Sequence, residues 1–143
     1  SIHQRKLADA LAAGAQQAAA KGDVAAFRQI ISDWQSLTSG IIGSTTTLVD
    51  GLIAKVFIGI PLKNFRDAAR AFSLENEAAY FAEFQDRIDA DRLERDRLNK
   101  FGKPGDELLL RKSSLLFGVT GPMIHRQVKS SPALAEAELR PAC

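Results

Sequence analysis

Few residues in this chain are suited to acid–base chemistry or metal binding. It contains two histidines, His3 and His125, and one cysteine, Cys143. A structural zinc site needs about four Cys or His ligands at short, fixed spacings, and these three side chains have no such spacing. A single cysteine also excludes an internal disulfide. We therefore predict no catalytic residue, no metal ligand and no cofactor, and we expect His125 to be a partly exposed polar side chain.

A run of carboxylates is the second candidate for chemistry. Such groups can act as an acid–base pair or bind magnesium. Arginines interleave with them, and charged, hydrated surroundings do not shift the pKa of a carboxylate as catalysis requires. Oppositely charged residues four apart, such as Glu83 with Arg87, stabilise an exposed helix instead. We interpret the run as a solvated helix face, which carries Asp86, Asp89, Asp91, Glu94 and Asp96.

The glycine- and threonine-rich segment 40–47 superficially resembles a phosphate-binding loop. The P-loop requires a lysine directly after its last glycine, whereas this chain has Ser44 after Gly43. Nucleotide binding is therefore not expected. The formal net charge of +2 also gives no argument for nucleic acid.

The N-terminal third is typical of a helical hairpin. The spacing predicts a helix over 5–20 with a stripe of Leu7, Leu11, Ala15 and Ala18. Gly22 can end that helix in the left-handed conformation, and Asp23 can cap a second helix that begins at Val24.

The hairpin sequence AAAKGDVAAFRQII resembles one unit of an ankyrin-type repeat, in which a similar Gly-Asp precedes an alanine-rich helix. Repeat proteins need about three stacked units, and no second copy follows at a period of about 33 residues. We interpret the likeness as shared helix-turn chemistry, and it implies no function.

Segment 40–62 is unusually apolar, with Asp50 and Lys55 as its only charged residues. It has about the length of a membrane span, but a central aspartate would cost about 2.5–3.5 kcal/mol in a bilayer. We predict a buried central helix over 41–60, with an oligomer interface or lipid contact as alternatives. Residues 39–47 could break the second helix, cap the third or form a joint.

Two further helices are predicted after Pro61. The first has a stripe of Leu62, Phe65, Ala69 and Phe72, and the second starts at Ser73 and runs over about 74–100. The buried face of the longer helix comprises Ala78, Phe81, Phe84 and Ile88, and its charged second half is exposed. Shorter helices are expected from Asp106 to near Gly118, from Thr120 through Val128, and from Ser131 to about Leu139.

The predicted fold is all-α: an irregular bundle of about five to seven helices, with an N-terminal hairpin and one long charged helix. A single domain would cover 1–139, followed by a loose tail at 140–143. The side chains expected to be buried are Phe27, Trp34, Leu52, Val56, Phe57, Phe65, Phe72, Phe81, Phe84 and Leu116.

The function expected from these patterns is that of a non-catalytic assembly or interaction subunit of a larger oligomeric particle, such as a virion, tail or secretion machine. Its partner would be a second copy or another protein, with membrane less favoured and nucleic acid unlikely on charge. Segregated charge and surplus apolar helix both suit packing between chains. The predicted interface residues are Leu48, Leu52, Val56, Phe57, Ile60, Arg92, Arg95 and Cys143.

Two alternatives remain open from the sequence. Residues 40–62 could insert into a membrane in a pore-forming or holin-like role, or the chain could be a small enzyme with an unfamiliar site. No secretory signal is visible at the N-terminus, which favours a cytoplasmic or particle-associated location.

Overall fold

A computed structural model describes residues 2–44, 57–101, 123, 124, 126, 128 and 131. These residues are mostly helical and contain no strand, so the all-α prediction is confirmed. Four helices are present within the described ranges, compared with five to seven predicted for the chain. They are α1 (Ile2–Lys21), α2 (Val24–Ser44), α4 (Leu62–Ala71) and α5 (Glu75–Phe101).

The hairpin between α1 and α2 forms through two residues that each serve a helix end. Gly22 adopts a left-handed φ of 66°, and its amide donates to Ala19 O at 3.2 Å. The Asp23 amide donates to Ala18 O at 2.9 Å, which completes a Schellman motif. The Asp23 carboxylate then accepts from the Ala26 amide at 3.0 Å and caps α2. The chain therefore reverses direction without an intervening loop.

The apolar stripe predicted for α1 is confirmed at Ala15 and Ala18, which are buried, and in part at Leu11, which packs against the core, but it is wrong at Leu7. Leu7 is 40% exposed and Leu11 is half-buried. The buried row consists of alanines instead: Ala8, Ala12, Ala15 and Ala18. Alanine allows neighbouring helices to approach closely, and the space at Gly14 is equally tight. A Cβ added there would lie 3.0 Å from Ile30 Cδ1 of α2.

Helix α2 continues into segment 39–47, for which a break in this helix was one of three alternatives. It continues through Gly40 to Ser44, so residues 41–44 end α2 and do not begin a separate central helix over 41–60. The far end of that apolar segment is buried in the chain, since Phe57 is 1% exposed and Ile58 is fully buried. Residues 57–59 form a helical turn. Residues 45–56, including Leu52 and Val56, lie outside the described residues.

Helix α4 presents the predicted stripe, because Leu62, Phe65 and Ala69 are buried and Phe72 is half-buried. Ser73 does not start the next helix as predicted. It ends α4 with a left-handed φ of 59°, its amide donating to Arg70 O at 3.0 Å and the Leu74 amide to Ala69 O at 2.8 Å. This is a second Schellman motif, with serine in the position that glycine usually occupies.

Helix α5 confirms the predicted long helix and its buried face, which includes Phe81, Phe84 and Ile88. Trp34 of α2 is the centre of the core. Its ring packs edge-to-face against three phenylalanine rings. The distances between ring centroids are 5.4 Å to Phe65, 6.1 Å to Phe81 and 6.0 Å to Phe84. Pairs of this kind contribute about 0.5–1.5 kcal/mol each beyond the area they bury. One side chain thus connects α2 with both α4 and α5.

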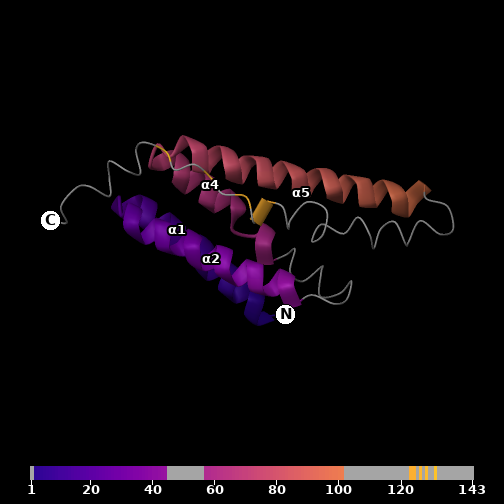
Figure 1. The fold of residues 1–143 in the computed structure, drawn as a ribbon, viewed down its shortest axis with the longest axis horizontal. Helices are drawn as coiled ribbons and strands as arrows, with labels where there is room; N and C mark the ends of the chain where they lie inside the picture. The colour runs from indigo at the N-terminus through magenta and orange to yellow at the C-terminus, as the bar shows by residue number, and fades with distance from the viewer. Residues whose placement is uncertain are drawn as a thin grey trace.

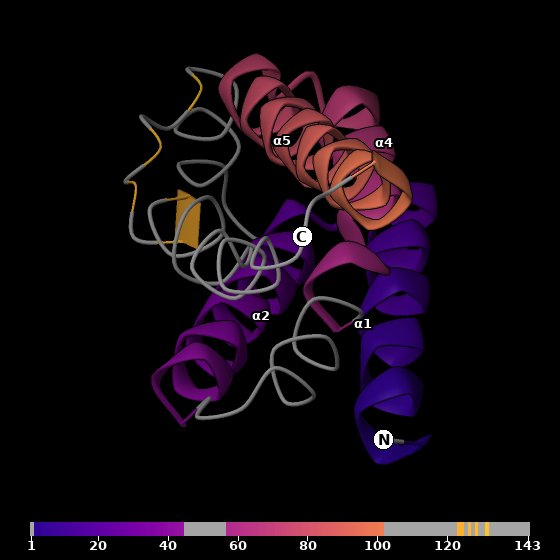
Figure 2. The same ribbon diagram turned by 90° about the vertical axis from the view of Figure 1, so that its right-hand side faces the viewer.

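The α1–α2 pair forms one layer, and α4 and α5 lie across it as the second (Figure 1). Helix α4 contacts both α1 and α5. Figure 2 shows the helical turn at 123–124 on the α2 side of α5. The helix predicted to run through Val128 is too long, because Arg126 and Val128 are not helical. The predicted helix over 106–118, Leu116 and the tail 140–143 lie outside the described residues.

Candidate binding groove

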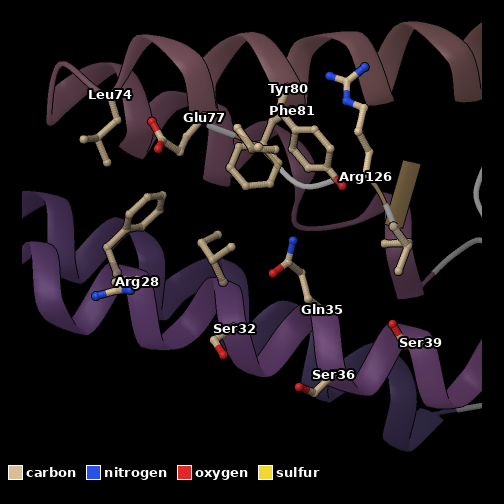
Figure 3. A pocket seen from close by; sticks show the side chains of 14 residues that line it. Arg28, Ser32, Gln35, Ser36, Ser39, Leu74, Glu77, Tyr80, Phe81 and Arg126 are labelled. Carbon is tan, nitrogen blue, oxygen red and sulfur yellow. The ribbon is translucent and has the colours of Figure 1, made fainter. Parts of the chain in front are cut away.

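A groove of about 790 Å³ lies between α2 and α5, and part of its wall comes from Ile124, Arg126 and Val128 (Figure 3). Its apolar lining belongs largely to the core, with Phe27 and Ile31 on α2 and Phe81 on α5. The polar lining comes from all three segments and comprises Arg28, Ser32, Gln35, Ser36, Ser39, Glu77, Tyr80 and Arg126. A hollow of this size and mixed polarity is suited to a peptide segment or a drug-sized molecule.

Helix α2 supplies a row of uncharged hydrogen-bonding side chains to one side of the groove. Ser32, Gln35, Ser36 and Ser39 are three or four residues apart, or adjacent within the row, so they share one helix face. Ser32 and Ser36 are exposed, whereas Gln35 and Ser39 are half-buried. Hydroxyl and amide groups both donate and accept, so this row can pair with a polypeptide backbone.

Tyr80 lies on the opposite wall and is held by contacts to two other segments. Its hydroxyl donates to the Met123 carbonyl at 2.5 Å. Gln35 points toward it from α2 (Figure 3) and supplies a side-chain hydrogen bond. Burial raises the pKa of Tyr80 to about 12, although Arg126 and Gln35 both act in the opposite direction. The phenol therefore stays protonated at neutral pH and cannot act as a base.

Arg126 is attached to α5 by an ion pair. Its guanidinium lies 2.7 Å from a carboxylate oxygen of Glu83 and 5.4 Å from the centre of the Tyr80 ring. Arg87 contacts the other oxygen of Glu83 at 2.9 Å. The hydrogen bond from Arg126 is the main cause that holds the pKa of Glu83 below its ordinary value. The same pairing raises the pKa of Arg126.

The carboxylate of Glu77 accepts two hydrogen bonds from Ser131. The amide of Ser131 donates to Glu77 Oε1 at 3.1 Å, and its hydroxyl donates to Oε2 at 2.6 Å. Ser131 is 1% exposed. Both carboxylate oxygens therefore accept hydrogen bonds within the chain.

Glu77 and Glu83 of α5 are thus engaged in contacts that join Ser131 and Arg126 to that helix. The rest of the polar lining comes from α2 and consists of Arg28, of Gln35, which already bonds Tyr80, and of the three serine hydroxyls. In the described residues no cluster of three or more His, Cys, Asp or Glu side chains is arranged to hold a metal ion. The groove is equipped for binding through hydrogen bonds and apolar contact.

The predicted interface residues do not gather at this groove. Phe57 is buried in the core and Ile60 is half-buried beside it, so Phe57 packs within its own chain. Arg92 is exposed on α5, 3.9 Å from Asp89. Arg95 belongs to α5, but its side chain is not described, and Leu48, Leu52, Val56 and Cys143 lie outside the described residues, as does His125.

The groove residues were not identified from the sequence. Helical periodicity could have indicated the polar row of α2, because its members recur at three- and four-residue spacing. They are Ser32, Gln35, Ser36 and Ser39. Tyr80, the only tyrosine in the sequence, was not included in the buried face predicted for its helix. The pairing of Glu77 with Ser131 joins residues 54 apart, and no local pattern indicates such a contact.

Comparison with known proteins adds no relative: no family model, no curated protein and no solved structure matches this chain. Among the helices that the structure describes, none is long and apolar enough to cross a bilayer.

Proposed function

We propose that this protein is a non-catalytic interaction subunit of an oligomeric assembly, and that the groove between α2 and α5 binds a polypeptide segment of a partner protein. The observation that carries the proposal is the chemistry of the groove lining. Glu77 and Arg126 are paired within the chain, whereas α2 offers, besides Arg28, uncharged donors and acceptors next to apolar side chains.

The dimensions of the polar row support a peptide occupant. From Arg28 to Ser39 the lining of α2 extends over about 17 Å at the rise of an α-helix. That length matches about five residues of extended chain or three turns of helix. Ile31 offers a half-buried apolar contact next to Ser32, at the start of the row. A segment with alternating polar and apolar residues would complement both.

The same proposal extends to the architecture. We infer that the chain forms one irregular bundle of five to seven helices, as its hydrophobic pattern predicts. The helical turns at 57–59 and 123–124 support this count, since each is separate from α1, α2, α4 and α5.

Site-specific photo-crosslinking tests the binding role. A photoreactive amino acid replacing Ser36 would sit on the groove rim, and the same group replacing Lys63 would sit on the exposed surface of α4. We expect a protein adduct from position 36 and none from position 63. The captured partner is then purified and titrated calorimetrically against the wild-type chain.

The decisive comparison uses Ser36→Trp against the matched Lys63→Trp. Filling the groove should weaken binding of the purified partner at least tenfold, or about 1.4 kcal/mol, while the control should leave it unchanged. A negative heat-capacity change on binding would accompany burial of apolar surface. Equal affinity of both variants would overturn the groove assignment, as would adducts from position 63 alone.

A further inference from the structure

A stripe with a seven-residue spacing runs along the outward face of α5. Asp86, Leu93 and Lys100 follow at that interval, and positions seven apart differ by only about 20° around an α-helix. All three residues are exposed, Leu93 to 65%. The buried residues Phe84 and Ile88 lie on the opposite side of the helix. The stripe therefore faces away from the core.

Leu93 is the most exposed large apolar side chain in the described part of the protein, ahead of Leu7 at 40% and Leu37 at 39%. A single exposed leucine is common on protein surfaces. This one differs because a carboxylate lies two turns before it on the same stripe and an ammonium group two turns after it.

The charge order along the stripe selects a partner and an orientation. We propose that α5 of one copy packs antiparallel against α5 of a second copy, about a two-fold axis at Leu93. Asp86 then faces Lys100 of the second copy, and the same pair recurs on the other side of the axis. A parallel arrangement would instead place Asp86 against Asp86 and Lys100 against Lys100, which like charges disfavour.

The flanking charges fit this arrangement. Arg92, with 62% of its side chain exposed, lies 3.9 Å from Asp89. In the antiparallel pair Asp96 of the second copy comes to the level between Arg92 and Asp89. Arg92 can then interact with both carboxylates and offset their repulsion.

The association should be weak and sensitive to salt. Its apolar contact is one leucine from each copy, and exposed ion pairs contribute about 0–1 kcal/mol each. Salt at about 1 M shortens the Debye length to about 3 Å and weakens such pairs. The surface is separate from the groove, so this proposal does not depend on a partner binding between α2 and α5.

Sedimentation equilibrium of the full chain in reducing buffer provides the first test. We expect self-association at low salt that weakens as salt is added. Asp86→Lys or Lys100→Asp alone should weaken it about tenfold, because each disrupts two symmetry-related pairs. The double variant Asp86→Lys/Lys100→Asp restores both pairs and should return the dissociation constant to within about threefold of the wild type.

Matched controls separate this surface from general effects. Leu93→Ala should weaken association, whereas Leu37→Ala on α2 should not, although both remove a partly exposed leucine. Lys63→Asp on α4 changes the net charge as Lys100→Asp does and should have no effect. Circular dichroism verifies that every variant keeps its helical content.

Disulfide trapping tests the orientation in a Cys143→Ser background. A mixture of Asp86→Cys and Lys100→Cys chains should oxidise to the mixed dimer, because those positions face each other. Predominant 86–86 and 100–100 dimers would overturn the antiparallel arrangement. A chain that stays monomeric at millimolar concentration would overturn self-association, and if it still bound a different protein through the groove, the proposed function would stand.

Discussion

Ser131 caps the first turn of α5 from 54 residues beyond Glu77. Its hydroxyl donates to Glu77 at 2.6 Å and accepts from the Asn76 amide at 2.9 Å. The residue that precedes the helix is Leu74, whose side chain has no oxygen to accept from the free amides. The cap therefore comes from the C-terminal segment, and the stability of α5 is coupled to the docking of that segment beside the groove.

Replacing Ser131 with alanine should lower the free energy of unfolding by about 1–2 kcal/mol. The substitution removes a helix cap and leaves one carboxylate oxygen of the half-buried Glu77 without its hydroxyl donor. Urea denaturation measures the change. Ser32→Ala, an exposed position on α2, serves as the control and should stay within about 0.5 kcal/mol of the wild type. Equal effects of the two substitutions would show that Ser131 does not cap α5.

Tyr80 should titrate well above an ordinary phenol. The chain has one tyrosine, so the ultraviolet absorbance of phenolate reports this residue alone. Burial places its pKa at about 12 in the folded protein, against 10.0 for an unperturbed tyrosine. We expect the absorbance midpoint near the higher value in buffer and near the lower value in concentrated urea. A folded-state midpoint at the ordinary value would contradict the burial of the hydroxyl.

The same shift makes stability depend on alkaline pH. Because the folded state raises the pKa, the protonated phenol contributes its full stabilisation below pH about 10, and this is lost as pH rises through about 12. A shift of two units corresponds to about 3 kcal/mol. Unfolding free energies measured across that window should fall more steeply for the wild type than for Tyr80→Phe, which carries no ionisable group there.

The Glu83 carboxylate should respond more to loss of Arg126 than to loss of Arg87. Both arginines lower its pKa, but the hydrogen bond from Arg126 is the larger cause. Arg126→Ala should raise the pKa of Glu83 toward its ordinary value, and Arg87→Ala should raise it less. A carbon-13 NMR titration of the carboxyl groups measures both shifts. The reverse order would indicate that Arg126 does not pair with Glu83 in solution.

The ion pair between Glu83 and Arg126 also determines how the stability of the fold changes at low pH. A depressed folded-state pKa means that the Glu83 pair stabilises the fold above the ordinary carboxyl pKa. That contribution disappears as pH falls through the lowered value. Arg126 should therefore detach from α5 at acidic pH, which would be visible as a loss of the Arg126–Tyr80 ring contact in NMR spectra.

Sequence periodicity predicted the buried face of α5 well and that of α1 less well, because it placed Leu7 in the core. On α5 the large apolar residues Phe81, Phe84 and Ile88 are the ones that fill space in the core. On α1 the fully buried row consists of alanines, while Leu11 is half-buried and Leu7 is 40% exposed. Hydrophobicity ranks leucine above alanine, but it carries no information about the distance between helices.

The groove could be predicted only in part. Helical spacing indicates the polar row of α2, because Ser32, Gln35 and Ser39 recur on one face. The opposite wall depends on tertiary contacts that local patterns do not encode. Met123 accepts from Tyr80 across 43 residues, and Ser131 reaches Glu77 across 54.

Gly22 and Ser73 provide a matched pair of substitutions with opposite expected signs. Each occupies the left-handed position after a helix, with φ of 66° and 59°, in the same hydrogen-bonded motif. Gly22→Ala has open space for its Cβ, so its cost comes from backbone strain and should be about 1 kcal/mol. Ser73→Gly relieves that strain and should raise the free energy of unfolding by up to about 1 kcal/mol. Urea denaturation of both variants, with Ser73→Ala as the control that keeps a Cβ, measures the two signs. A destabilised Ser73→Gly would mean that the serine side chain contributes more to the turn than its backbone strain costs.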